Sequence, residues 1–227
     1  MAKKIRVGIL DDHQAIIDGY MFRLRDHPEI EVATTAHFGD ELEEMVQEHD
    51  LDILLLDITL PTAPDNSNPY PLLHLIPKIL REKQGIAILV VSMHNQDSLI
   101  RAVMEAGASG YIVKDDHDSI QNLGDIITSV VRGGVYFSQN AYKLITQQGS
   151  KEVERLTPRQ REVLSLLASR PHLTTVGMAE VLEVAPSTIR NLLSDAYARL
   201  EVPNRAAAIV KARQLGLITP DKPRAGD

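Results

Sequence analysis

The first half of the chain alternates short apolar runs with stretches whose apolar residues recur at helical spacing. The apolar runs are "IRVGIL" (5–10), "EVATTA" (31–36), "DILLLDI" (52–58), "AILVVS" (87–92) and "GYIVK" (110–114). Between them, apolar residues recur three or four positions apart, as in Ile120, Leu123 and Ile127. Continuous apolar strands that alternate with amphipathic helices predict a five-stranded parallel sheet, buried on both faces in an α/β domain.

This alternation ends near residue 132. The stretch "GGVYFSQNAYKLITQQGSKEVER" (133–155) mixes Gly, Ser and polar residues around one possible short helix, which favours a linker. After it, only helical periodicity remains. Thr157, with Pro158 next and Gln160 three positions on, predicts a capped helix start.

Further helices are predicted at about 175–182, 186–200 and 204–215. We therefore expect an α/β domain in residues 1–132, a linker in 133–155, and a small all-α four-helix domain in 156–217. The polar stretch "PDKPRAGD" near the end favours a disordered tail over 218–227.

Composition separates the two parts of the chain further. The 227 residues are 44% hydrophobic and contain no apolar run long enough to cross a bilayer. The start lacks the pattern of a signal peptide, and the absence of Cys excludes disulfides and thiolate metal sites, which fits a cytoplasmic protein. The net charge is −7, but residues 1–130 carry 10 basic and 22 acidic residues, whereas 156–220 carry 8 and 5. The second part is therefore the better candidate for contact with nucleic acid.

Polar residues stand where the predicted strands end. Asp11 and Asp12 follow the first strand, Asp57 lies at the end of the third, Ser92 of the fourth and Lys114 of the fifth. The carboxyl ends of parallel strands meet at one edge of the sheet, where ligands bind. Clustered carboxylates suit Mg²⁺, and a nearby ammonium and hydroxyl could bind phosphoryl oxygens, so Asp57 is a candidate nucleophile.

Each of these residues alone has an ordinary explanation as a turn residue, a helix cap or a solvated side chain. Their joint occurrence at strand ends, in this order, favours the functional reading. His13, His94 and His117 also fall near this edge. They show no paired ligand spacing, so we expect solvated loop histidines.

Residues 1–130 resemble the receiver domain of response regulators, which has a flavodoxin-like fold. The matching segments are "ILDDH", "LLLDITLP", "VVSMHN" and "GASGYIVKDD". The resemblance implies that Asp57 is the phosphoacceptor and that Asp12 and Asp57 hold Mg²⁺ directly. It also implies that Asp11 acts through water and that the backbone carbonyl of Thr59 completes the protein ligands.

The same resemblance assigns three further roles. Ser92 is the switch hydroxyl, Tyr111 the aromatic residue that changes rotamer, and Lys114 the partner of the phosphoryl group. A histidine kinase is the implied phosphoryl donor.

Two other functions remain open. Phosphatases of the haloacid dehalogenase type also use a strand-end Asp with Mg²⁺, but they need a second acid where this chain has Thr59. A regulator that works without phosphorylation, with the first domain as a dimerisation or ligand-binding module, also stays possible. The irregular loop 61–71 departs from the family pattern. It either affects access to Asp57, contacts a partner, or is a tolerated surface insertion.

Residues 156–217 resemble the LuxR-type helix-turn-helix, and the whole chain resembles the NarL/FixJ class of response regulators. The matching segments are "LTPRQREVLSLLA", "MAEVLEVAPSTIRNLLSDAYARLEV" and "NRAAAIVKARQLGL". Within the predicted helix 186–200, an apolar stripe predicts one packed face. That stripe consists of Ile189, Leu193, Ala196 and Leu200.

The opposite face carries Ser187, Arg190, Asn191 and Ser194, whose side chains suit base edges in a major groove. Thr188 could bind a backbone phosphate. The resemblance implies a transcriptional regulator that binds double-stranded DNA as a homodimer and is controlled by phosphorylation.

Two positions near this helix depart from the family. Glu183 stands where Gly is typical, and positive φ would strain it, so the turn could differ. Ala185 stands where a capping Ser is usual, and Ser187 could cap a later helix start instead.

Overall fold

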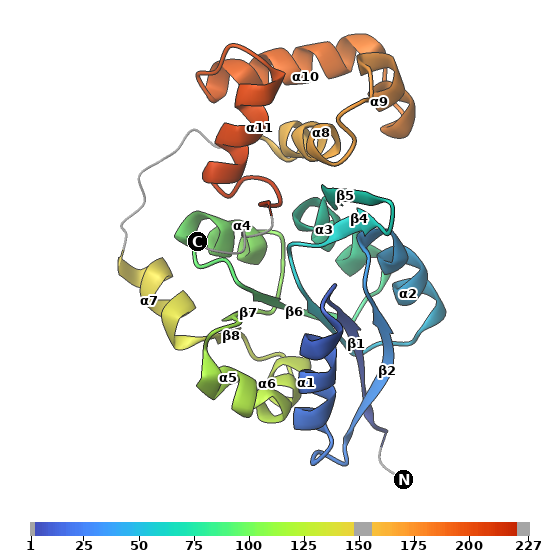
Figure 1. The fold of residues 1–227 in the computed structure, drawn as a ribbon, viewed down its shortest axis with the longest axis vertical. Helices are drawn as coiled ribbons and strands as arrows, with labels where there is room; N and C mark the ends of the chain where they lie inside the picture. The colour runs from blue at the N-terminus through green and yellow to red at the C-terminus, as the bar shows by residue number, and fades with distance from the viewer. Residues whose placement is uncertain (1–2, 148–155, 222–227) are drawn as a thin grey trace.

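In the computed structural model, residues 3–147 and 156–221 are described, and they form an α/β domain followed by a helical domain (Figure 1). The α/β domain is built on a sheet of order β2-β1-β3-β6-β7-β8, in which all neighbouring strands pair in parallel. Its strands are β1 (Ile5–Leu10), β2 (Ile30–Ala36), β3 (Ile53–Leu56), β6 (Ala87–Ser92), β7 (Gly110–Val113) and β8 (Tyr136–Phe137). The predicted fold class and its five strands are confirmed, and β8 adds a sixth.

Helices cover both faces of this sheet, as Figure 1 shows. On one side lie α1 (Gln14–Leu24), α5 (His117–Gln121) and α6 (Leu123–Val131). On the other lie α2 (Leu42–Glu48), which follows the short 3₁₀ turn η1 (Gly39–Glu41), then α3 (Leu72–Glu82), α4 (Asp97–Glu105) and α7 (Gln139–Gln147).

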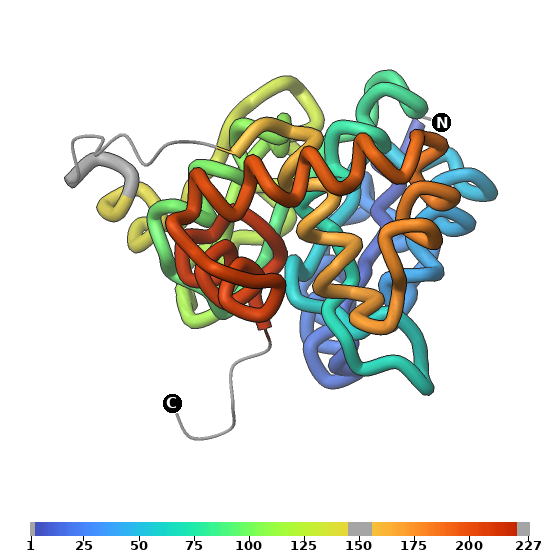
Figure 2. Tube along the Cα trace, turned by 90° about the horizontal axis from the view of Figure 1, so that it is seen from above, coloured from blue at the N-terminus to red at the C-terminus, as the bar shows by residue number. Residues whose placement is uncertain are grey.

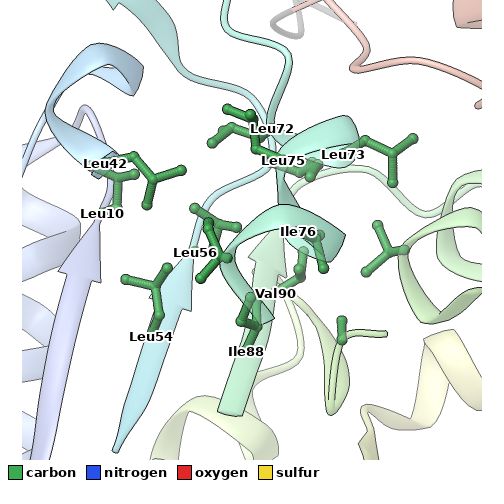
Figure 3. Packing of buried hydrophobic residues seen from close by; sticks show 14 of the residues in the cluster. Leu10, Leu42, Leu54, Leu56, Leu72, Leu73, Leu75, Ile76, Ile88 and Val90 are labelled. Carbon is green, nitrogen blue, oxygen red and sulfur yellow. The ribbon is translucent and has the colours of Figure 1, made fainter. Parts of the chain in front are cut away.

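Successive residues of the central strands enter two different cores. In β3, Leu54 and Leu56 pack beneath α3, where Leu72 and Ile76 meet them (Figure 3). Leu55, between them, points to the opposite core with α1 and α6. Side chains alternate across a strand, so a strand must be apolar throughout to be buried on both faces. This explains the uninterrupted apolar runs in the sequence.

The predicted linker is structured in its first part. Tyr136–Phe137 forms β8, which pairs with β7, and α7 packs Ala141 and Leu144 into the core beneath α4. Residues 133–147 therefore belong to the α/β domain, and the expectation of a linker was wrong for them. Residues 148–155 lie outside the described part of the chain, so the rest of this boundary stays a prediction.

The irregular loop 61–71 contains an antiparallel hairpin. Its strands are β4 (Pro61–Ala63) and β5 (Asn66–Pro69). Tyr70, at the end of the hairpin, lies so close to Gly39 of η1 that a Cβ there would stand 2.1 Å from its ring. On its other side the hairpin contacts α8 of the helical domain. The insertion is therefore packed between two parts of the molecule.

The helical domain contains α8 (Pro158–Ser169), α9 (Thr175–Val181), α10 (Pro186–Arg199) and α11 (Arg205–Gln214). The capping box is confirmed, because Thr157 Oγ1 accepts from the backbone N of Gln160 and Gln160 Oε1 accepts from the backbone N of Thr157. The predicted apolar stripe of α10 is buried in this domain's own core.

The turn before α10 carries a non-glycine residue in a strained conformation. Glu183 adopts a φ of +51°, in the left-handed region that favours Gly. Helix α10 begins at Pro186 with Ala185 at the N-cap, where no side chain supplies a capping hydrogen bond. The alternative of a later start capped by Ser187 was therefore wrong.

The helical domain rests on the α3–α4 side of the α/β domain (Figure 1). His74 of α3 pairs with Glu162 of α8 at 3.3 Å. Ile218 and Thr219, which we expected in a disordered tail, are buried instead, and Ile218 belongs to the core of the helical domain. Residues 222–227 lie outside the described range. In the described segments, no helix has the length and apolar character needed to cross a membrane.

Candidate functional site

The strand ends bring the predicted polar residues to one edge of the sheet. Leu10 of β1 pairs with Leu56 of β3, and the backbone N of Asp57 donates to the carbonyl of Leu10 at 2.9 Å. Asp11 and Asp57, the next residues of the two strands, therefore stand side by side. Both are buried.

Lys114 bridges these two carboxylates. Its Nζ lies 2.6 Å from Asp11 Oδ2 and 2.8 Å from Asp57 Oδ2, and its side chain is only 8% exposed. Burial raises the pKa of Asp57 above its ordinary value, although the charge of Lys114 opposes this. Burial also lowers the pKa of Lys114, but the attraction of Asp57 and Asp11 outweighs it, so the pKa of the ammonium is raised. The site favours a cation beside Asp57.

A second group of ligand atoms adjoins this bridge. One ligand atom each from Asp11, Asp12 and His13 lies within 4.8 Å of the others. The backbone N of Thr59 donates to Asp57 Oδ1 at 3.0 Å. The hydroxyl of Thr59 is buried and has no hydrogen-bond partner in the described part of the chain. Oxygen-rich surroundings with an unused buried oxygen fit a hard divalent cation such as Mg²⁺.

The predicted switch residues are linked through His94. Ser92 is fully buried, and its Oγ accepts from the backbone N of His94 at 3.2 Å. The hydroxyl of Tyr111 donates to the carbonyl of His94 at 2.7 Å, and burial raises the pKa of this tyrosine. Tyr111 is fully buried in the core, so its ring points inward.

The three histidines near the site differ from one another. His13 and His117 are exposed, as expected for loop residues. His94 is partly buried, and this burial lowers its pKa below the ordinary value. The nearby Asp221 opposes the shift but does not cancel it. The expectation of a solvated residue was therefore wrong for His94. Its neighbour Asp221 is 127 positions away, so no local sequence pattern could indicate the contact.

The polar face that we predict to contact DNA lies on α10. The residues of this face are all exposed, whereas Ile189 and Leu193 between them are buried; the face consists of Ser187, Thr188, Arg190, Asn191 and Ser194. Helix α10 lies on the side of the helical domain that is turned away from the α/β domain, as the two views in Figures 1 and 2 show. This face is therefore open to a large partner.

Comparison with known families identifies both domains. Residues 7–123 match the model described as response regulator receiver domain. Residues 154–212 match the model described as bacterial regulatory proteins, luxR family. The chain therefore belongs to the response regulators with a receiver and a LuxR-type DNA-binding domain.

Individual relatives extend over nearly the whole chain. The transcriptional regulatory protein DegU of Brevibacillus brevis is 28% identical over 95% of this chain and 95% of its own length. The transcriptional regulatory protein LnrK of Bacillus subtilis is 29% identical, with 94% and 98% covered. A solved structure of RcsB from Salmonella enterica serovar Typhimurium, bound to a promoter with the phosphomimetic BeF3-, has a TM-score of 0.57 at 21% identity. It covers 92% of this chain and 98% of that one. The chain is a transcriptional regulator of this class.

Proposed function

We propose that Asp57 accepts a phosphoryl group from a histidine kinase. The observation that carries this proposal is the Lys114 bridge between Asp11 and Asp57 at the carboxyl edge of the sheet. One Asp57 oxygen is held by Lys114 and the other by the backbone N of Thr59, so the carboxylate has a fixed orientation. After transfer, the ammonium of Lys114 would pair with a phosphoryl oxygen instead of the carboxylates.

The acidic group would hold Mg²⁺ during this reaction. We assign Asp12 and Asp57 as direct ligands, Asp11 as a ligand through water and the carbonyl of Thr59 as the remaining protein ligand. The ion would supply positive charge that offsets the repulsion between the carboxylates and the incoming phosphoryl group. The buried Thr59 hydroxyl, which has no hydrogen-bond partner among the described residues, supports a polar ligand at this place.

Ser92 and Tyr111 would transmit the new state. The hydroxyl of Ser92 now accepts a hydrogen bond from the backbone N of His94. It would give up this hydrogen bond and bind the phosphoryl group instead. Tyr111 now donates to the carbonyl of His94. Its side chain would change rotamer when the loop that carries His94 moves. Phosphorylation would thereby shift an existing equilibrium between two receiver conformations.

The output would be binding to double-stranded DNA by a homodimer in the cytoplasm. Arg190 and Asn191 would contact guanine and adenine edges, with Ser187 and Ser194 beside them and Thr188 on a phosphate. Support comes from the exposure of all five side chains and from RcsB structures described as dimers bound to DNA. Two copies would read half-sites about one helical turn apart.

The test measures oligomeric state and DNA affinity with and without a small phosphodonor and Mg²⁺. We expect the wild-type protein to dimerise and to bind paired half-sites more tightly after treatment, while Asp57→Asn stays unchanged. If Asp57→Asn responds in the same way as the wild type, the proposed control through Asp57 is wrong. If neither protein responds but both bind DNA, the regulator works without phosphorylation.

A further inference from the structure

A cavity of about 370 Å³ lies between the receiver and the DNA-binding domain. One wall comes from α2, α3 and the hairpin β4–β5, and the other comes from α8, the end of α9 and the turn that follows it. Figure 1 shows α8 lying over the hairpin and α3. The volume of the cavity is within the range of pockets that hold small organic molecules.

The hairpin after Pro61 supplies part of this cavity. Thr62 of β4 and Tyr70, which directly follows β5, both line it. The ring of Tyr70 is held in place by its close contact with Gly39. The segment 61–71 is where this chain departs from the family pattern, so this wall does not belong to the family's common fold.

Two of the acidic side chains in the walls already have cationic partners. Glu43 Oε1 lies 2.5 Å from Nζ of Lys78, which also lines the cavity. Glu162 pairs with Arg159, and its other oxygen lies 3.3 Å from Nε2 of His74. The charges of these acids are therefore offset within the walls.

Two polar groups of the lining remain for a ligand, the guanidinium of Arg170 and the hydroxyl of Tyr70. Among the described residues, neither group has a hydrogen bond or an ion pair. Burial raises the pKa of Tyr70 to about 12, and the nearby charge of Arg170 opposes this rise. The hydroxyl therefore stays protonated at neutral pH and can donate a hydrogen bond.

These two groups favour a carboxylate as their ligand. The planar guanidinium of Arg matches the two oxygens of a carboxylate, and a hydroxyl donor beside it adds a further hydrogen bond. Arg170 supplies one positive charge, which balances a carboxylate but not a doubly charged phosphate. Glu183, the remaining acid of the lining, is exposed, so water and salt screen its charge.

The rest of the lining is apolar. Leu75 of α3 and Leu166 of α8 line the cavity from opposite domains, and both are buried. Leu182 and Val181, at the end of α9, extend this apolar surface. An aliphatic or aromatic body would bury its surface against these side chains, which favours its transfer out of water.

We propose that this cavity binds a small organic acid, with its carboxylate between Arg170 and Tyr70 and its apolar body between Leu75 and Leu166. Both domains contribute to the walls, so a bound acid would stabilise the arrangement in which they enclose it. The site is separate from the proposed phosphorylation site, because neither Asp57 nor Lys114 lines the cavity.

Fluorine NMR of two matched compounds tests this site in the full-length protein. The probe is 4-(trifluoromethyl)benzoate, and its control is 4-(trifluoromethyl)benzamide, which has the same apolar ring but no charge. Binding broadens and shifts the fluorine signal of each compound, so a titration gives its dissociation constant. We expect the wild type to bind the benzoate with a dissociation constant below about 1 mM, about tenfold more tightly than the benzamide.

Two variants test the assigned polar contacts. Arg170→Gln should lower the affinity for the benzoate about tenfold and leave that for the benzamide unchanged. Tyr70→Phe keeps the ring beside Gly39 and removes only the hydroxyl, so the affinity for the benzoate should fall about threefold. The matched control is Arg132→Gln, because both arginines are exposed and directly follow the last residue of a helix. It should bind both compounds as the wild type does.

A third variant fills the cavity instead of changing its charge. Val181 is 46% exposed, so Val181→Trp adds bulk to the lining without replacing a core residue, and it should weaken the binding of both compounds. Thermal unfolding checks that each variant is folded. Equal binding of the benzoate and the benzamide by the wild type would overturn the proposal, as would unchanged binding by a folded Arg170→Gln or Val181→Trp. No binding of the benzoate by the folded wild type at about 10 mM would also overturn it.

Discussion

The ammonium of Lys114 lies 2.8 Å from Oδ2 of Asp57, and both side chains are only 8% exposed. Removing one partner from such a buried pair leaves an uncompensated charge, whereas an exposed pair contributes little. Lys114 therefore offsets the charge of two buried carboxylates, Asp11 and Asp57, and holds the proposed phosphoacceptor in one orientation.

Lys114→Met should destabilise the receiver in the absence of divalent cations. We expect a loss of about 3 kcal/mol in the free energy of unfolding, because Asp11 and Asp57 would remain buried without their cation. Urea unfolding measures this loss. The control is Lys78→Met, which removes the cation from a partly exposed pair with Glu43. Its free energy of unfolding should fall by less than about 1 kcal/mol. Equal losses for the two variants would show that the bridge has no special importance.

Asp57 should make stability depend on pH in a defined direction. The pKa of Asp57 is raised from 3.8 on folding, so the folded state holds its proton more tightly than the unfolded state. Ionisation of Asp57 therefore costs stability as pH rises from about 4 through the folded pKa. Without divalent cations, Asp57→Asn should be more stable than the wild type at pH 7, and this advantage should shrink as pH falls through the folded pKa and be lost at about pH 4.

Thermal unfolding across this pH range tests the prediction. Asp65→Asn is the control, because it removes a carboxylate from an exposed hairpin turn where Asn is equally suited. A pH-independent difference between Asp57→Asn and the wild type would contradict the assigned shift.

Arg190→Ala should weaken binding to specific DNA. The Arg190 side chain is exposed on α10, and a bidentate contact of Arg with guanine contributes about 1–3 kcal/mol to discrimination between bases. We expect a loss of about 10- to 100-fold in affinity for the cognate site, with less effect on unrelated DNA. The matched control is Arg132→Ala, which removes the same charge from an exposed position on the receiver. If both variants lose affinity equally, Arg190 acts only through net charge.

Glu183→Gly should stabilise the DNA-binding domain. Glu183 has a φ of +51°, and this left-handed conformation costs a non-glycine residue about 1–2 kcal/mol, part of which the entropy of Gly offsets. We expect a gain of about 1 kcal/mol in the free energy of unfolding. The control Glu180→Gly, inside α9, should lower the free energy of unfolding by about the same amount. If Glu183→Gly is also destabilising, the side chain of Glu183 makes a contact that outweighs its strain.

The sequence was enough to predict where the strands end, but not the contacts around Ser92 and Tyr111. The apolar runs fixed where β3 and β7 end, and parallel pairing alone brings Asp57 and Lys114 to one edge. By contrast, β8 has two residues within a Gly- and Ser-containing stretch, and the hairpin after Pro61 is polar and proline-rich, so neither has a clear strand pattern. The pairing of His74 with Glu162 joins two domains, and only the tertiary arrangement reveals it.

The central claim, that Asp57 accepts the phosphoryl group, is tested most directly by the intact mass of the protein after treatment with a small phosphodonor and Mg²⁺. The wild type should gain the mass of one phosphoryl group, and Asp57→Asn should gain none. An equal gain in Asp57→Asn, or no gain in the folded wild type, would contradict the account.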